Sequence, residues 1–198
     1  IKSISEDYFN SSSKENKDNV KHRFNELIDF IDKNDYLEKE DKKKFLSWNP
    51  FENQPAEFFD SEIQFGIKSF DIVIGNPPYG AKLTNEEKKI YKSLFKYTTQ
   101  GSMDTYKLFI ERGFNLLKKE GNLNYIVPMS VTSSKSNIAL HKMLLENCEF
   151  IKVSSYSNAP SRIFYNADQR VSIINFMRTN SKTKILLTTK INKKLSNQ

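Results

Sequence analysis

Residues 70–80 constrain the fold of this chain more than any other stretch. They begin with an apolar, β-branched run, Phe70-Asp71-Ile72-Val73-Ile74, whose composition is typical of a buried strand. The run is followed by Gly75-Asn76-Pro77-Pro78-Tyr79-Gly80, where two prolines remove two backbone donors and stop strand pairing. The stretch therefore predicts a rigid loop at the carboxyl end of a buried strand. In open α/β sheets, ligands bind at this end of the strands.

The predicted loop offers two kinds of contact to a ligand. The Asn76 side chain carries a carbonyl oxygen, and the Pro77 carbonyl belongs to a residue that has no N–H. A stiff Pro77-Pro78 turn can hold both acceptors towards one exocyclic amino group. Tyr79 adds an aromatic face on which a base can stack. The alternative interpretation is a plain strand-ending turn with a solvent-facing tyrosine, since Asn-Pro and Pro-Pro also mark turns.

Apolar periodicity along the rest of the chain predicts alternating helices and strands, and hence an α/β fold. Thr84 and Asp104 are expected to cap the two helices after the loop, and Gly121 is expected to end the second one. Residues 1–20 are polar and predict a frayed start or a linker. Strands are expected at residues 123–127, 150–156 and 171–177, and helices at residues 20–30, 37–46, 84–97, 104–119 and 138–145.

Composition excludes several classes of protein. Cys148 is the one cysteine, which excludes an internal disulfide and fits a reducing cytoplasm. With His22 and His141 as the two histidines, no metal site of the ordinary zinc type can be assembled. No apolar run approaches the roughly 20 residues that span a bilayer, so we expect no membrane partner. The net charge of +7 suits a polyanion, although a chain rich in Lys, Asn and Ile throughout can reach it by coding bias.

The loop sequence Asn76-Pro77-Pro78-Tyr79 resembles the NPPY motif of DNA adenine-N6 methyltransferases, in particular of type IIG (Eco57I-like) restriction–modification enzymes. The resemblance continues in the Trp-Asn-Pro-Phe stretch at residues 48–51 and in the Gly-Asn-Leu-Asn-Tyr-Ile-Val-Pro stretch at residues 121–128. In this family, the target adenine is flipped from double-stranded DNA into a pocket.

The resemblance implies a fold and a division into domains. The expected fold is α/β: the C-terminal half of a class I (Rossmann-like) S-adenosylmethionine-dependent methyltransferase sheet, preceded by an N-terminal helical hairpin. The expected domains are a helical segment at residues 1–46, a catalytic half-domain at residues 47–180 and a tail leading out of the domain at residues 181–198.

The resemblance also implies an activity and the residues that perform it. A methyl group would pass from S-adenosyl-L-methionine to N6 of a flipped adenine, with Asn76 and the Pro77 carbonyl accepting the amino hydrogens and Pro78 stiffening the turn. Asn76 would also contact the cofactor. Tyr79 and Phe164 would stack on the base, with Tyr165 left as the alternative second aromatic residue. Two alternatives are open. One is an RNA or protein-glutamine N-methyltransferase, whose substrate also presents an NH2 group to be methylated. The other is a non-catalytic DNA-binding or docking fragment.

The chain departs from the family in its glycines. The family's first half carries a Phe-x-Gly-x-Gly type of loop that closes around the cofactor, and glycine is needed there because the backbone approaches the ligand. This chain has six glycines, and no two of them are separated by a single residue. We therefore expect a missing N-terminal half or a partner chain to bind the cofactor, and the isolated chain to be inactive. We also expect strand 70–74 to pair with another chain or to be covered by the N-terminal helices.

Overall fold

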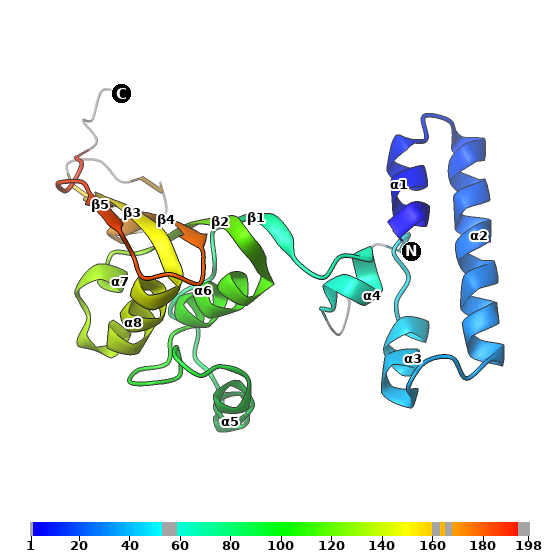
Figure 1. Ribbon diagram of the computed structural model, residues 1–198, viewed down its shortest axis with the longest axis horizontal. Coiled ribbons are helices and arrows are strands. Elements are labelled where there is room, and N and C mark those ends of the chain that lie inside the picture. The colour runs from blue at the N-terminus through cyan, green and yellow to red at the C-terminus, as the bar shows by residue number, and fades with distance from the viewer. Residues whose placement is uncertain (1, 53–58, 160–162, 165–167, 194–198) are drawn as a thin grey trace. The chain divides into compact units, whose positions relative to one another are not determined.

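The computed structural model describes residues 2–52, 59–159, 163–164 and 168–193 (Figure 1). The chain forms two compact units, residues 1–69 and residues 70–198. This division differs from the boundaries at 46/47 and 180/181 that the sequence predicts.

The first unit is helical. It contains α1 (Lys2–Asn10), α2 (Lys14–Lys33), α3 (Lys39–Leu46) and α4 (Ser61–Phe65). Phe24 of α2 is buried, and its ring lies 6.5, 6.1 and 5.4 Å from the rings of Phe45, Trp48 and Phe51. The predicted pair of helices in this region is thus confirmed as α2 and α3, joined by an aromatic core.

The expectation of an unstructured start at residues 1–20 is wrong. This stretch forms α1 and the first turns of α2. The Ser13 side chain accepts a hydrogen bond from the Asn16 amide at 3.2 Å and so caps α2. A serine tract that resembles a linker in composition therefore serves as a helix N-cap.

The second unit is a five-stranded mixed sheet with helices. Its strands are β1 (Phe70–Gly75), β2 (Leu117–Pro128), β3 (Cys148–Tyr156), β4 (Val171–Arg178) and β5 (Ile185–Thr188), in the order β1-β2-β4-β3-β5. Strand β1 runs parallel to β2, β4 runs antiparallel to both β2 and β3, and β5 runs parallel to β3. The α/β class and the four strands predicted after residue 69 are confirmed.

Helices cover one face of this sheet. The second unit contains α5 (Asn85–Leu94), α6 (Thr105–Leu116), α7 (Ser130–Ser133), the 3-10 turn η1 (Lys135–Asn137) and α8 (Ile138–Asn147). Helices α6 and α8 lie under the same face, whereas α5 lies farther from the sheet and buries no residue (Figure 1). The core forms between α6, α8 and the strands, with Ile110, Leu123, Leu140 and Phe176 fully buried.

The prediction that residues 70–74 form a buried strand is wrong in this chain. Strand β1 lies at an edge of the sheet and pairs with β2 alone. The side chains of Ile72 and Ile74 are 64% and 79% exposed, because they point away from the face that α6 covers. Val73 points to the opposite face and packs against the core. The composition of a strand buried on both faces is therefore present, but the described residues cover one face.

Two further boundaries differ from the sequence prediction. Helix α6 ends at Leu116, and Gly121 lies within β2, where an added Cβ would come 2.9 Å from the Phe70 carbonyl oxygen. Gly121 therefore serves the close approach of β2 to β1 and does not end a helix. The predicted tail at residues 181–198 includes β5, which extends the sheet. The segment between β2 and α8 contains α7 and η1.

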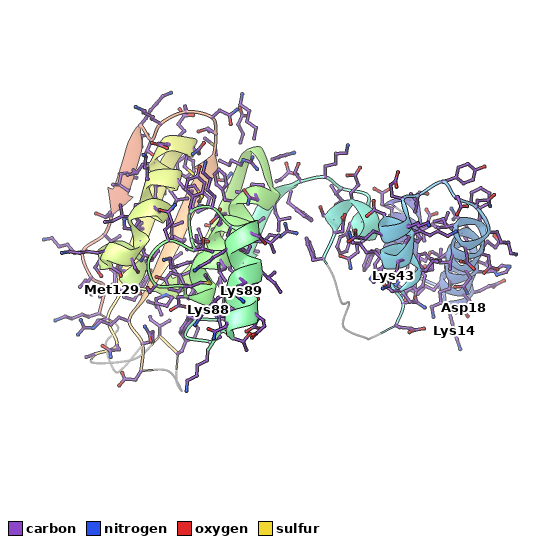
Figure 2. The ribbon with its side chains drawn as sticks, turned by 90° about the horizontal axis from the view of Figure 1, so that it is seen from below. Lys14, Asp18, Lys43, Lys88, Lys89 and Met129 are labelled. Atoms are coloured by element: carbon purple, nitrogen blue, oxygen red, sulfur yellow. The ribbon has the colours of Figure 1, made fainter. Side chains whose placement is uncertain are left out.

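Charged side chains on α2 and α5 lie on the surface of the two units. Lys14 and Asp18 are exposed on α2, and Lys88 and Lys89 are exposed on α5 (Figure 2). None of the described helices combines the length and the apolar character needed to cross a membrane.

Candidate functional site

The register of the sheet places three connections at one edge. Gly75 pairs with Tyr125 in the parallel β1–β2 ladder, so the loop after β1 lies beside the last residues of β2. Val171, the first residue of β4, pairs with Pro128 of β2 and with Tyr156 of β3. The loop after β1, the segment after β2 and the β3–β4 connection therefore lie at the same end of the strands. For the parallel strands β1 and β2 this is the carboxyl end, where α/β sheets bind ligands.

The first residues of α6 anchor the loop after β1. The Thr105 hydroxyl donates a hydrogen bond to the Pro78 carbonyl oxygen at 2.7 Å. The Gly80 amide donates to Oδ1 of Asp104 at 3.1 Å. These bonds join residues 24 and 27 positions apart in the chain. The loop is therefore held by the core helix and not by its own turn alone.

Two acceptors of the loop remain available. Asn76 is exposed, and its side chain forms no hydrogen bond with any other residue that the structure describes. Pro77 is buried, and its carbonyl accepts no bond from a described donor, in contrast to the Pro78 carbonyl. The Asn76 amide and the Pro77 carbonyl are thus the adjacent polar groups through which this loop can bind a ligand.

Tyr79 joins the loop to the core. Its side chain is half-buried and packs against the hydrophobic cluster between α6 and the sheet. On the strand side of the loop, a Cβ added at Gly75 would lie 3.3 Å from the ring of Tyr125, a tight contact. Burial raises the pKa of Tyr125, so its phenol stays protonated over the neutral range. Gly75 therefore allows β1 to end in close contact with the ring of Tyr125.

Phe164 lies in the β3–β4 connection and is half-buried. The two ends of this connection lie at the same edge as Asn76. The structure records no ring contact between Phe164 and Tyr79. Tyr165, the alternative aromatic residue, lies outside the described residues.

Sequence reasoning missed a set of buried charges on α6. Glu111 is 3% exposed and accepts hydrogen bonds from the amides of Lys96 and Thr98, both at 2.8 Å. Lys107 is 1% exposed and donates to the carbonyls of Gln100, Ser102 and Ser136 at 3.2, 2.8 and 2.8 Å. Burial lowers the pKa of the Lys107 amine, and the nearby Asp104 carboxylate partly opposes this. Both side chains fix the segment that connects α5 to α6.

The sequence does carry a signal for these residues. Positions 104, 107 and 111 are charged and lie on one side of a helix whose other residues are largely apolar. Charged residues spaced in this way on a buried helix indicate specific polar partners.

Asp104 does not act as the sequence predicts. It occupies the N-cap position of α6, but its side chain forms no capping hydrogen bond. The carboxylate accepts from the Gly80 amide instead. Thr84 behaves as predicted: it caps α5 and forms a reciprocal capping box with Glu87.

Comparison with known proteins identifies the family. The sequence profile of the Eco57I restriction-modification methylases matches residues 3–164, which is more than half of the chain. The chain belongs to this family. The match confirms the resemblance that the Asn-Pro-Pro-Tyr loop indicates.

Curated methyltransferases are similar to parts of this chain. The type II restriction enzyme and methyltransferase RM.Eco57I of Escherichia coli is 34% identical over 133 residues, which cover 65% of this chain and 12% of that protein. The type II methyltransferase M.HincII of Haemophilus influenzae is 30% identical over 113 residues, covering 55% of this chain and 22% of that protein. The chain thus spans a small part of the curated relatives it matches.

A solved structure also resembles the chain. It is a putative class I S-adenosylmethionine-dependent methyltransferase from Listeria monocytogenes, with a TM-score of 0.49 and 21% identity. The alignment covers 63% of this chain and 38% of that one.

Proposed function

We propose that this chain forms the base-binding part of a DNA methyltransferase that methylates N6 of a flipped adenine in double-stranded DNA, within a restriction–modification system. The observation that carries the proposal is the pair of acceptors without a described donor, Asn76 Oδ1 and the Pro77 carbonyl, in a loop whose Tyr79 packs against the core. Membership of the Eco57I family supports it. The partner we propose is DNA, and the location is therefore the cytoplasm.

The two acceptors address the central difficulty of the reaction. The lone pair of the adenine amino nitrogen is delocalised into the ring, which makes the nitrogen a poor nucleophile. Asn76 Oδ1 and the Pro77 carbonyl would each accept one amino hydrogen and so localise the lone pair towards the incoming methyl group. The Pro78 carbonyl already accepts the Thr105 hydroxyl, whereas the Pro77 carbonyl has no described donor. Orientation and hydrogen bonding supply the acceleration, and no general base is required.

Aromatic residues would hold the base. The Tyr79 ring is anchored against the core, so it can present a fixed face to the adenine. Phe164 is our candidate for the opposite face, because the connection that carries it ends at the same edge of the sheet. Stacking of this kind contributes about 1–3 kcal/mol per base.

The methyl donor that the family implies is S-adenosyl-L-methionine, which supplies an electrophilic methyl group when it is bound. The residues of this chain do not form a cradle for it, because no two of the six glycines are separated by a single residue. We place Asn76 where this chain would touch the cofactor, and we assign the remaining cofactor contacts to residues outside these 198.

The test is to express the complete natural polypeptide that carries this chain in a bacterial host without adenine methylation. Digested DNA is then analysed for N6-methyldeoxyadenosine by mass spectrometry. We expect the modified nucleoside with the unaltered protein and a loss of about 10²–10³-fold with Asn76→Ala. The control is Asn115→Ala, which alters an exposed asparagine of α6 away from this loop and should retain activity.

Two results would contradict the proposal. Methylation that persists in Asn76→Ala would remove Asn76 from the reaction. Methylated RNA nucleosides or methylglutamine, in place of N6-methyldeoxyadenosine, would assign the loop to one of the alternative acceptors with an amino group.

A further inference from the structure

We propose that Asp104 and Thr105, at the start of α6, are positioning residues that hold the Asn-Pro-Pro-Tyr loop in its binding geometry. The proposal rests on the proposed function, since the position of the loop affects catalysis only if the loop binds the base. It adds two residues that never touch the base and act through the backbone of the loop.

The two bonds hold the backbone on both sides of Tyr79. The Thr105 hydroxyl binds the Pro78 carbonyl at 2.7 Å, directly before Tyr79. The Asp104 carboxylate binds the Gly80 amide at 3.1 Å, directly after it. A residue fixed at both neighbours cannot rotate its backbone freely, so α6 sets the position from which the Tyr79 side chain leaves the loop.

The same contacts determine which carbonyl faces a ligand. Consecutive carbonyls of the Pro77-Pro78 turn are both acceptors, and a base that met either one would sit in a different place. Thr105 binds the Pro78 carbonyl, whereas the Pro77 carbonyl next to Asn76 has no described donor. The hydroxyl therefore fixes the direction of the Pro78 carbonyl as well as holding the loop.

Gly80 shows that the loop needs external support. Its φ is +73°, in the left-handed region, and nothing lies within 4 Å of a Cβ added there. The end of the loop is thus open on its outer side, and the Asp104 carboxylate is the recorded partner of the Gly80 amide. A hydrogen bond to an ionised carboxylate is stronger than one between neutral groups, which suits an anchor on the surface.

Helix α6 is a suitable anchor because it is fixed in the core. Tyr106 and Ile110 are 3% and 0% exposed, and Lys107 and Glu111 bind the preceding segment. The Asp104 side chain forms no capping bond to its own helix. Its carboxylate is therefore directed at the loop, which distinguishes positioning from ordinary helix capping.

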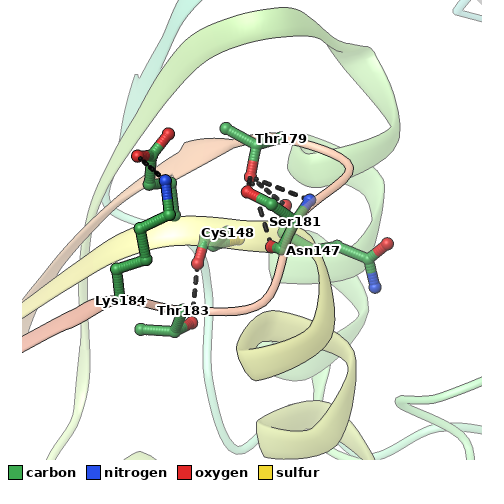
Figure 3. Close-up of polar contacts among 7 residues, drawn as sticks. Asn147, Cys148, Thr179, Ser181, Thr183 and Lys184 are labelled. Carbon is green, nitrogen blue, oxygen red and sulfur yellow. Dashed lines mark hydrogen bonds and ion pairs between the residues drawn. The ribbon is translucent and has the colours of Figure 1, made fainter.

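The experiment compares variants in the complete natural polypeptide. Thr105→Val removes the hydroxyl at nearly constant volume, Thr105→Ser keeps it, and Asp104→Ala removes the carboxylate. The matched control is Thr183→Val. The Thr183 hydroxyl donates to the Cys148 carbonyl at 2.6 Å, at the end of the strands opposite the loop (Figure 3).

Misplacement of the loop should act on the methyl transfer step. We expect Thr105→Val and Asp104→Ala to lower kcat by about tenfold to 10²-fold, with little change in the KM for S-adenosylmethionine. Thr105→Ser should restore kcat to near that of the unaltered protein, and Thr183→Val should leave it unchanged. Equal kcat values for Thr105→Val, Asp104→Ala and Thr183→Val would overturn the proposal.

A second measurement does not depend on activity. Hydrogen–deuterium exchange of the peptide containing residues 76–80 should be faster in Thr105→Val and Asp104→Ala than in Thr183→Val. Unchanged exchange would show that α6 does not hold the loop. A protein that forms no N6-methyldeoxyadenosine, but whose loop exchanges faster in these two variants, would contradict the proposed function and leave the positioning role supported.

Discussion

At the scale of single residues, the loop after β1 divides its polar groups between structure and binding. The Pro78 carbonyl and the Gly80 amide are bonded to α6, whereas the Asn76 amide and the Pro77 carbonyl remain open. Asn76 is exposed, so its side-chain amide can bind a ligand without breaking a hydrogen bond within the protein. The proposed division between support of the loop and contact with the base follows this pattern of bonded and open groups.

Tyr79 provides a test of stacking at this scale. Tyr79→Ala removes the aromatic face and should raise the KM for DNA by about 5- to 150-fold, which corresponds to ~1–3 kcal/mol per stacked base. Tyr79→Phe retains the face and should bind DNA normally. Since Tyr79 also packs against the core, thermal unfolding of both variants must accompany the kinetics. Equal KM values for the two variants would rule out stacking by this residue.

At the scale of elements, α6 is the part of the second unit on which the site depends. Its apolar side chains form the core beneath the sheet, and its polar side chains hold two connections. Buried charges are costly unless their hydrogen bonds are complete, and both Glu111 and Lys107 have several partners. The helix therefore couples the position of the loop to the packing of the core.

Lys107 provides a test of this coupling. Lys107→Met leaves three carbonyl oxygens without their donor and should lower the free energy of unfolding by about 2–3 kcal/mol. The exposed Lys88→Met is the matched control and should change it little. Alkylation of Cys148 can report unfolding of this unit, because the thiol is fully buried and burial raises its pKa to about 12. Equal alkylation rates in the two variants would contradict a structural role for Lys107.

Lys107 should also make the stability of the fold depend on pH. Burial lowers the pKa of Lys107 below its ordinary value of 10.5 in the folded chain. Between that lowered pKa and 10.5 the unfolded chain binds more protons than the folded one, so the Lys107 contribution to stability rises with pH in this window. The difference in stability between the unaltered protein and Lys107→Met should therefore increase as pH approaches 10.5.

At the scale of the whole molecule, the described helices of the second unit cover one face of its sheet. Residues alternate along β2 and β4 between buried positions towards α6 and α8 and half-exposed positions on the other side. The open edge of β1 presents unpaired backbone groups together with Ile72 and Ile74. Such an edge is a template for pairing with another strand, and we propose that the cofactor-binding half supplies that strand.

The isolated 198-residue chain should therefore self-associate through β1. Ile74→Lys places a charge on the open edge and should shift the chain towards monomer in sedimentation velocity experiments. Leu187→Lys is the matched control, since Leu187 is 54% exposed on β5 at the other edge of the sheet. If Leu187→Lys shifts the chain towards monomer and Ile74→Lys does not, the chain self-associates through β5 and the prediction is wrong.

The sequence by itself determined the loop and most of the elements around it. The Asn-Pro-Pro-Tyr loop, strands β1 to β4, helices α5, α6 and α8 and the Thr84 cap could all be predicted, because each depends on residues close together in the chain. Proline stops a strand wherever it occurs, and apolar periodicity specifies which side of an element is buried. The family could be predicted for the same reason, since its motif is contiguous.

The tertiary structure alone decided which partners the polar residues find. Asp104 stands where the sequence predicts a helix cap, but its carboxylate accepts a hydrogen bond from the Gly80 amide, 24 residues away in the chain. The β1 run had the composition of a strand buried on both sides, but its exposure depends on which chain segments pack against it. Local patterns specify what a residue can do. Donors, acceptors and covering surfaces that are distant in sequence determine what it does, because hydrogen bonds and burial depend on distance in space.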